Sequence, residues 1–252
     1  SIQGNLLVSC GGLKHLNPDI IITIGGQTGD YSIYNALNLT KNTEHWRVCE
    51  DGNVVNTYNR LNKIFECPAF YFFNRMKKDM QVDHSYYEEW KNMNSTMNYN
   101  VEVPFSNLYV AQQLYKDIPQ NSIMNFAILN SLRSWSYFPL NTSIQGYANV
   151  AAFGIDGCNS MLIGESMNTN EFCFIVTGDL AFFYDMNALG IRHIKNNVRI
   201  LLVNNNGGAE FKIMTKKWKD NVNVDNFISA NGHNGNAKGL SLIHISEPTR
   251  LR

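Results

Sequence analysis

Short apolar runs alternate with helical patterns along most of the chain, and this alternation predicts an α/β fold. Residues 20–24 read Ile-Ile-Ile-Thr-Ile and run into the Gly25-Gly26 pair, so they predict a buried strand followed by a tight turn. Residues 44–48 predict a second short strand. After a turn at Asp51-Gly52, residues 53–65 predict a helix.

From residue 104 onward the alternation of strands and helices becomes regular. Ser106 is expected to cap a helix whose apolar positions recur at helical spacing until Pro119. The elements predicted after this helix are strands over 122–129, 143–147, 172–176 and 198–203, a helical turn from Ser131, and helices over 156–167 and 180–192. Strands joined by helices of this length indicate βαβ crossovers and a mostly parallel sheet.

The chain is expected to contain two domains. Residues 1–83 form a first, partial domain and residues 105–239 a second. The stretch over 70–99 is rich in charged and polar residues with weak periodicity, so it predicts a helical, solvated connection, with the linker itself over 84–104.

The two ends of the chain suggest a piece of a longer protein. The chain begins with Ser1 and has no leader sequence. Residues 240–252 read LSLIHISEPTRLR, which closely resembles the conceptual translation of a transposase adapter used in sequencing libraries. We therefore expect a non-native tail and a second domain that is truncated near Gly239. A genuine amphipathic tail is the alternative.

The charge and the cysteine content of the chain indicate which binding partners and which cellular compartment to expect. The chain has 21 Lys and Arg residues and 21 Asp and Glu residues, which argues against a nucleic acid or an anionic membrane as the main partner. No apolar run approaches the roughly 18 residues that a membrane span needs. The five cysteines include no CxxC pair, which favours a reducing, cytoplasmic setting.

Polar residues follow two of the predicted strands, at the edge where parallel α/β sheets bind ligands. The strand over 172–176 leads to Asp179, which places a carboxylate at a strand tip. The strand over 198–203 leads to Asn204-Asn205-Asn206-Gly207-Gly208, which offers amide oxygens and a backbone that allows close approach. A carboxylate, an amide oxygen and a backbone carbonyl together suit Mg²⁺ and its phosphate ligands. The alternative for Asp179 is a structural helix cap.

The spacing of these motifs resembles that of thiamine-diphosphate-dependent enzymes. Gly178-Asp179 is followed, one crossover helix later, by Asn204-Asn205, and Phe153-Gly154-Ile155-Asp156-Gly157 lies upstream. Within this family the sequence is similar to the menaquinone-pathway synthases that join a succinyl unit from 2-oxoglutarate to isochorismate. It also looks like the carboligases and decarboxylases of polysaccharide loci. The likeness is specific over residues 108–239.

The resemblance implies which domains of the family this chain would contain. The second domain would be a truncated thiamin diphosphate-binding fold with a parallel sheet. Residues 1–83 are similar to part of the family's Rossmann-like central domain. The family's pyrimidine-binding domain, with the glutamate that activates the cofactor, would be missing, so this chain by itself is expected to be inactive.

The resemblance also implies roles for individual residues. Asp179 and Asn205 would ligate Mg²⁺ through side-chain oxygens, and Gly207 through its carbonyl oxygen. Five residues would contact the cofactor: Gly154, Ile155, Gly178, Leu180 and Ala181. Ile155 would hold the cofactor in its bent conformation, although an ordinary core isoleucine is the alternative.

The residues at the positions expected to bind the substrate differ from those of the menaquinone-pathway enzymes. Asn130-Ser131 matches their Asn-Ser motif, but the arginine expected four residues after Ser131 is Trp135, and Arg133 is out of register. The arginine expected after Asn149 is Val150. The loss of two bidentate carboxylate clamps argues against isochorismate as the substrate.

His233 is a further candidate on the substrate side. Its sequence context, Asn231-Gly232-His233-Asn234-Gly235, fits a loop that faces the substrate, with a polar surface turn as the alternative.

The sequence therefore predicts a thiamine-diphosphate- and Mg²⁺-dependent lyase or carboligase that decarboxylates a 2-oxo acid. It would either release an aldehyde or add the acyl unit to an acceptor. The resemblance implies a homodimer or tetramer, because the family's cofactor lies between two subunits. Two alternatives remain open: an inactive cofactor-binding subunit, and a nucleotide-binding α/β domain.

Overall fold

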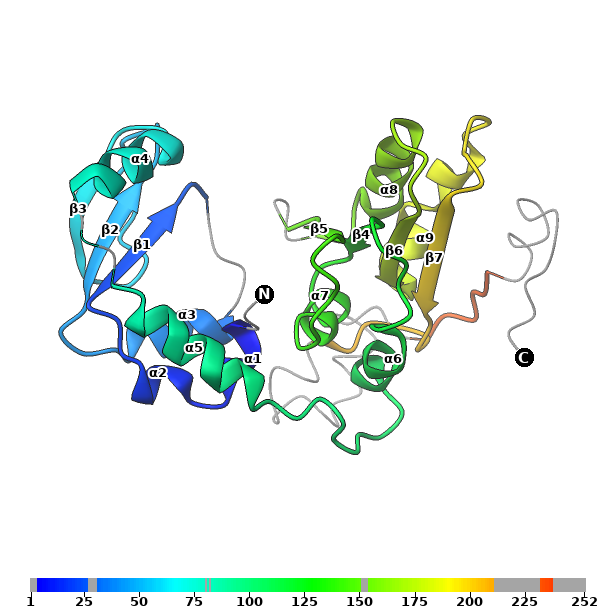
Figure 1. Cartoon of the computed structure of the whole chain (residues 1–252). Helices are drawn as coiled ribbons and strands as arrows, with labels where there is room; N and C mark the ends of the chain where they lie inside the picture. The colour runs from blue at the N-terminus through cyan, green and yellow to red at the C-terminus, as the bar shows by residue number, and fades with distance from the viewer. Residues whose placement is uncertain are drawn as a thin grey trace. The chain divides into compact units, whose positions relative to one another are not determined.

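The computed structural model describes residues 4–26, 31–79, 81, 83–150, 154–210 and 232–237 of the chain, whose elements are labelled in Figure 1. The proposed tail over 240–252 lies outside the described residues. The chain divides into two compact units, residues 1–101 and 102–252. Each unit contains a parallel sheet and helices, which confirms the predicted α/β class.

The first unit is built on a three-stranded parallel sheet with the order β1-β2-β3. Its strands are β1 (Ile20–Ile24), β2 (Glu44–Val48) and β3 (Leu61–Phe65). Its helices are α1 (Gly4–Ser9), α2 (Gly12–His15), α3 (Tyr31–Asn38), α4 (Ala69–Asp79) and α5 (Ser85–Ser95). β1 and β2 have the bounds that the apolar pattern predicts.

The predicted helix over 53–65 is wrong, because its last five residues form β3. β3 pairs in parallel with β2, so its backbone groups bond across the sheet. The Asn56 side chain accepts from the backbone N–H groups of Arg60 and Leu61, each at 2.9 Å, and so competes with helical bonding. Asn59 has φ 54°, in the left-handed region, which interrupts a right-handed helix.

α5 falls in the predicted linker and carries contacts to the start of the chain. The Tyr86 hydroxyl donates to the Leu16 carbonyl at 3.1 Å. The Trp90 ring covers Gly12 so closely that a Cβ there would lie 2.8 Å from it. α5 has no fully buried residue, so it lies on the surface of the first unit. The predicted domain boundaries stay a prediction.

The second unit is built on a four-stranded parallel sheet with the order β5-β4-β6-β7, as Figure 1 shows. Its strands are β4 (Ile123–Phe126), β5 (Gln145–Ala148), β6 (Cys173–Gly178) and β7 (Val198–Val203). Its helices are α6 (Asn107–Leu114), α7 (Asn130–Trp135), α8 (Cys158–Met167), α9 (Asp179–Tyr184) and the 3-10 helix η1 (Met186–Gly190). The parallel sheet predicted for this region is confirmed.

One predicted helix, over 180–192, is divided into α9 and η1. Asp185 ends α9, and its carboxylate accepts from the backbone N–H and the hydroxyl of Ser160, at 2.7 and 2.8 Å. These bonds hold the break against the start of α8.

Two apolar clusters in the core of the second unit involve α8 and α9. The first contains Ala127, Cys158, Leu162, Cys173, Ile175 and Ala181. The second contains Ile163, Phe182, Ala188 and Leu189. Both clusters take residues from α8 and α9, so the helix that starts at Asp179 is fixed by packing on β6. None of the helices in the described part of the chain is long and apolar enough to cross a membrane.

Candidate functional site: an oxygen cluster at the ends of β6 and β7

The carboxyl ends of β6 and β7 bring together the two motifs that the sequence singles out. The strands are neighbours, and their paired register ends with Gly178 opposite Val203. Asp179 therefore begins α9 beside the loop that follows β7. This is the edge at which parallel sheets bind ligands.

Asp179 is almost fully buried, with 2% of its surface exposed. Its Oδ1 accepts from the Leu180 backbone N–H at 2.8 Å. Its Oδ2 accepts from the backbone N–H groups of Asn205 and Gly207, at 3.1 and 3.0 Å. These hydrogen bonds satisfy the buried carboxylate oxygens and tie them directly to the loop after β7.

Three groups from this region form what we call the oxygen cluster: the Asp179 carboxylate, the Asn205 side-chain amide and the Gly207 carbonyl. The inward-facing atom of the Asn205 amide lies 2.9 Å from the Gly207 oxygen and 3.2 Å from Asp179 Oδ2. Both neighbours are acceptors. The amide nitrogen satisfies them when no cation is bound, and the amide oxygen can take the same place only if a cation lies among the three groups.

The spacing within the cluster fits a small divalent cation. Adjacent oxygens in an octahedral Mg²⁺ shell with bonds of about 2.1 Å are about 3 Å apart, close to the separations here. The donor set is one carboxylate, one amide and one carbonyl, all hard ligands. Among the described residues no group of three or more His, Cys, Asp and Glu side chains could hold a metal. The candidate site therefore depends on amide and backbone oxygens.

The backbone of the loop is shaped for this arrangement. Asn206 has φ 65° and Gly207 has φ 153°, values that L side chains rarely adopt. The Asn204 side chain accepts from the Asn206 backbone N–H at 3.1 Å and supports the turn. The glycine that the sequence proposes as a carbonyl ligand thus occupies a position where glycine is favoured.

Three of the residues predicted to contact the cofactor lie at the end of β6 and the start of α9. Gly178 is the last residue of β6, and the Leu180 backbone N–H donates a hydrogen bond to Asp179. Ala181 belongs to the first apolar cluster, and Ile155 packs against the same cluster. These roles, and that of Gly154, stay predictions.

The substrate-side motif forms the start of α7. Ser131 is buried, and Leu129 just before the helix has φ 71°, an uncommon backbone conformation for leucine. Trp135 is buried, with its ring 5.9 Å from that of Phe126. The position where the family resemblance expects an arginine therefore holds a core side chain.

Arg133 is paired with a residue that the sequence reasoning missed. Its guanidinium lies 3.2 and 3.3 Å from the two carboxylate oxygens of Glu210, and it donates to the Asn130 side chain at 3.0 Å. Glu210 follows the glycine pair after β7, so this ion pair joins α7 to the loop of the oxygen cluster. No local motif could have revealed a pair separated by 77 positions.

His233 lies against the oxygen cluster, with its Nε2 3.1 Å from Asp179 Oδ2. The sequence is compatible with two interpretations of His233: a loop that faces the substrate, or a surface turn. The contact to Asp179 had no signal in the sequence.

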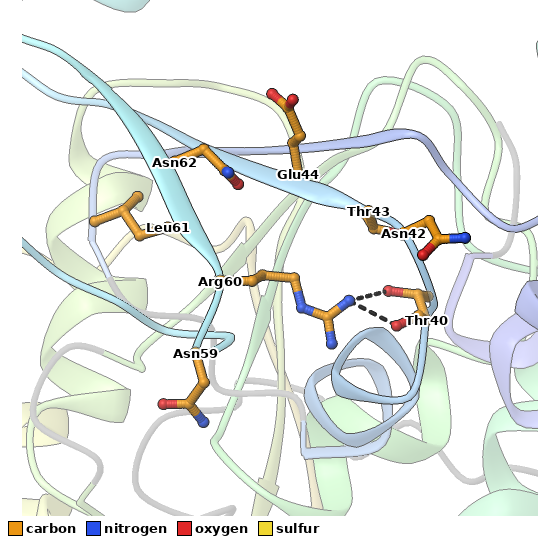
Figure 2. Close-up of a pocket in the computed structure, with 8 residues that line it drawn as sticks. All are labelled: Thr40, Asn42, Thr43, Glu44, Asn59, Arg60, Leu61 and Asn62. Carbon is orange, nitrogen blue, oxygen red and sulfur yellow. Dashed lines mark hydrogen bonds between the residues drawn. The ribbon is translucent and has the colours of Figure 1, made fainter.

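A cavity of about 500 Å³ in the first unit is a weaker candidate. Figure 2 shows the eight residues that line it: Thr40, Asn42, Thr43, Glu44, Asn59, Arg60, Leu61 and Asn62. Arg60 donates to the Thr40 carbonyl and hydroxyl and to the Asn38 carbonyl, at 2.7 to 2.9 Å. The cavity lies where β2 and β3 begin, which is the edge opposite to that of ligand sites in parallel sheets. Its arginine therefore fastens loops together.

No family model matches the chain. It is 34% identical over 228 residues to the 2-succinyl-5-enolpyruvyl-6-hydroxy-3-cyclohexene-1-carboxylate synthase of Christiangramia forsetii, across 85% of this chain and 37% of the relative. Synthases of the same name from Bacteroides thetaiotaomicron and Phocaeicola vulgatus are 32% and 30% identical, across 78% and 90% of this chain.

The chain spans 35% to 40% of the length of these three relatives. The matches nevertheless take in most of this chain, including the region of the oxygen cluster. The chain is therefore homologous to one part of these synthases, and the resemblance to that family is confirmed.

Proposed function

We propose that this chain carries the diphosphate- and Mg²⁺-binding part of a thiamine-diphosphate-dependent enzyme. The enzyme would decarboxylate a 2-oxo acid and either release an aldehyde or transfer the acyl unit to an acceptor. The observation that supports this most is the oxygen cluster, in which the inward atom of Asn205 lies 2.9 and 3.2 Å from two acceptor oxygens. The homology to the synthases supports the same reaction class.

In this proposal the residues of the second unit bind and orient. Asp179, Asn205 and Gly207 would hold Mg²⁺, and the cation would bind the diphosphate oxygens. When bound, thiamine diphosphate supplies the carbon nucleophile and the electron sink for decarboxylation. Asp179 is buried, and burial strengthens the attraction of its carboxylate for a cation.

We propose a less acidic acceptor than the one used by the menaquinone-pathway enzymes. Trp135 is a buried core residue, and the guanidinium of Arg133 is neutralised by Glu210. Recognition of several carboxylates needs arginine side chains with free donors. We also propose that the complete enzyme is a homodimer or tetramer with its cofactor between subunits.

The test uses the gene product that carries this sequence, purified with thiamine diphosphate and Mg²⁺. CO₂ release is followed from pyruvate, 2-oxoglutarate and other 2-oxo acids. We expect release from at least one acid, and a loss of about 100-fold or more in Asp179→Ala. Bound cofactor without turnover of any acid would instead support an inactive binding subunit. Absence of bound cofactor would support a nucleotide-binding domain and contradict the proposal.

A further inference from the structure

His233 is held in a short segment, residues 232–237, that returns to the loop of the oxygen cluster. The Gly232 backbone N–H donates to the Asn206 carbonyl at 2.9 Å. The Asn204 side chain donates to the Gly235 carbonyl, also at 2.9 Å. These two bonds fasten the segment to the same loop that carries Asn205 and Gly207.

The His233 ring itself is fixed on two further sides. It packs edge-to-face on Phe183 of α9, with ring centroids 5.3 Å apart. Gly235 leaves it little room, since a Cβ at that position would lie 3.0 Å from Phe183 and 3.3 Å from His233 Nδ1. A side chain held in this way has lost most of its rotamer freedom before any ligand arrives.

The hydrogen bonding of the ring indicates which nitrogen carries the proton. The Gly235 backbone N–H donates to Nδ1 at 3.1 Å, so Nδ1 is the acceptor. In the neutral ring the proton is then on Nε2. Nε2 is buried and has no well-aligned hydrogen bond, but it lies 3.1 Å from Asp179 Oδ2. Nε2 is thus held beside the carboxylate of the oxygen cluster without a well-aligned hydrogen bond to it.

We propose that His233 is a positioning residue for Asp179. This inference rests on the proposed function, because it assigns His233 to the cation site of that function. The two backbone bonds fix Oδ2 from the side of the loop, and His233 approaches it from the segment over 232–237. Groups that hold a ligating carboxylate in place commonly change metal affinity 10- to 100-fold when they are removed.

The experiment measures Mn²⁺ binding, as a probe for Mg²⁺, to the full chain by electron paramagnetic resonance. We expect Asp179→Ala to abolish binding and His233→Ala to weaken it about 10-fold. His233→Gln, which keeps a polar side chain beside Asp179, should recover part of the affinity. His193→Ala, at an exposed histidine of the same unit, is the matched control and should bind like the unaltered chain.

Each other outcome overturns the inference. Unchanged or tighter binding in His233→Ala, with binding still lost in Asp179→Ala, contradicts the positioning role and leaves the proposed function intact. Absence of Mn²⁺ binding by the unaltered chain contradicts both. Nitrogen-15 NMR of the histidine rings gives a reading that does not depend on how the variants fold. A neutral His233 ring protonated on Nδ1 would overturn the inference by itself.

Discussion

The two units differ in the hydrogen-bond partners that they provide for buried ionisable side chains. The carboxylate of Asp179 in the second unit accepts hydrogen bonds from three backbone N–H groups. His45 in β2 is fully buried, with one hydrogen bond to the Thr23 hydroxyl at 2.9 Å and no partner for Nδ1. Burial, together with the nearby charges of Arg47 and Arg60, lowers the pKa of His45 below its usual value. The first unit therefore favours the neutral form of this ring.

The lowered pKa of His45 predicts a loss of stability in acid. The unfolded chain takes up a proton on this ring as the pH falls through about 6.5, whereas the folded chain resists it. The free energy of unfolding should therefore rise with pH just below 6.5, by no more than about 1.4 kcal/mol per pH unit for one proton. Urea unfolding at several pH values measures this slope.

The matched variants separate His45 from other titrating groups. His45→Phe keeps a ring beside Tyr58 and should flatten the slope. His15→Phe, at an exposed position of α2, should keep it. Equal slopes in His45→Phe and the unaltered chain would show that another group is responsible.

At the scale of elements, caps and buried faces decide where the helices of the second unit begin. The Ser106 hydroxyl accepts from the Tyr109 backbone N–H at 3.2 Å and caps α6, as its sequence position predicts. We expect Ser106→Ala to lower the free energy of unfolding by about 1 kcal/mol, because it leaves that N–H without its acceptor. Chemical denaturation measures this change. Ser106→Thr keeps the cap and should lose less; equal losses in both variants would contradict the capping role.

The burial of Trp135 predicts that the arginine of the menaquinone enzymes does not fit into α7. Trp135→Arg should destabilise the second unit by about 3 kcal/mol or more, because it removes a packed ring and buries a charge. Thermal unfolding measures the loss. Val150→Arg, at the half-buried position of the second expected arginine, should cost less. A Trp135→Arg variant as stable as the unaltered chain would mean that this side chain points to solvent.

The elements that sequence reasoning found correctly are those with local signals. The apolar runs of β1, β2 and β7 have the predicted bounds, and Ser106 has the side chain that a cap needs. The helix expected over 53–65 is wrong, because neither the bonds of the Asn56 side chain nor the strand pairing of β3 leaves a local apolar pattern. This strand depends on pairing with β2, which is a long-range interaction.

The same distinction applies to the candidate site. Asp179 and Asn205 could be chosen from the sequence because both follow apolar strands, and neighbouring parallel strands bring their carboxyl ends together. The pairing of Arg133 with Glu210 and the contact of His233 with Asp179 join distant positions. A single sequence holds no periodicity that records such contacts.

At the scale of the whole molecule, the oxygen cluster and His233 belong entirely to the second unit. The three groups of the proposed cation site therefore all come from residues 102–252. The homology to the synthases is also partial, since this chain matches 35% to 40% of the length of three relatives. In our proposal the remaining parts of catalysis come from regions beyond this match.

The central claim is that Asp179, Asn205 and Gly207 hold a cation that binds thiamine diphosphate. Isothermal titration of thiamine diphosphate into the gene product that carries this sequence, with and without Mg²⁺, tests it most directly. We expect binding that requires Mg²⁺, is lost in Asp179→Ala, and is retained in Asp117→Ala, a variant at an exposed aspartate of the same unit. Binding without Mg²⁺, or binding that survives Asp179→Ala, would contradict the claim.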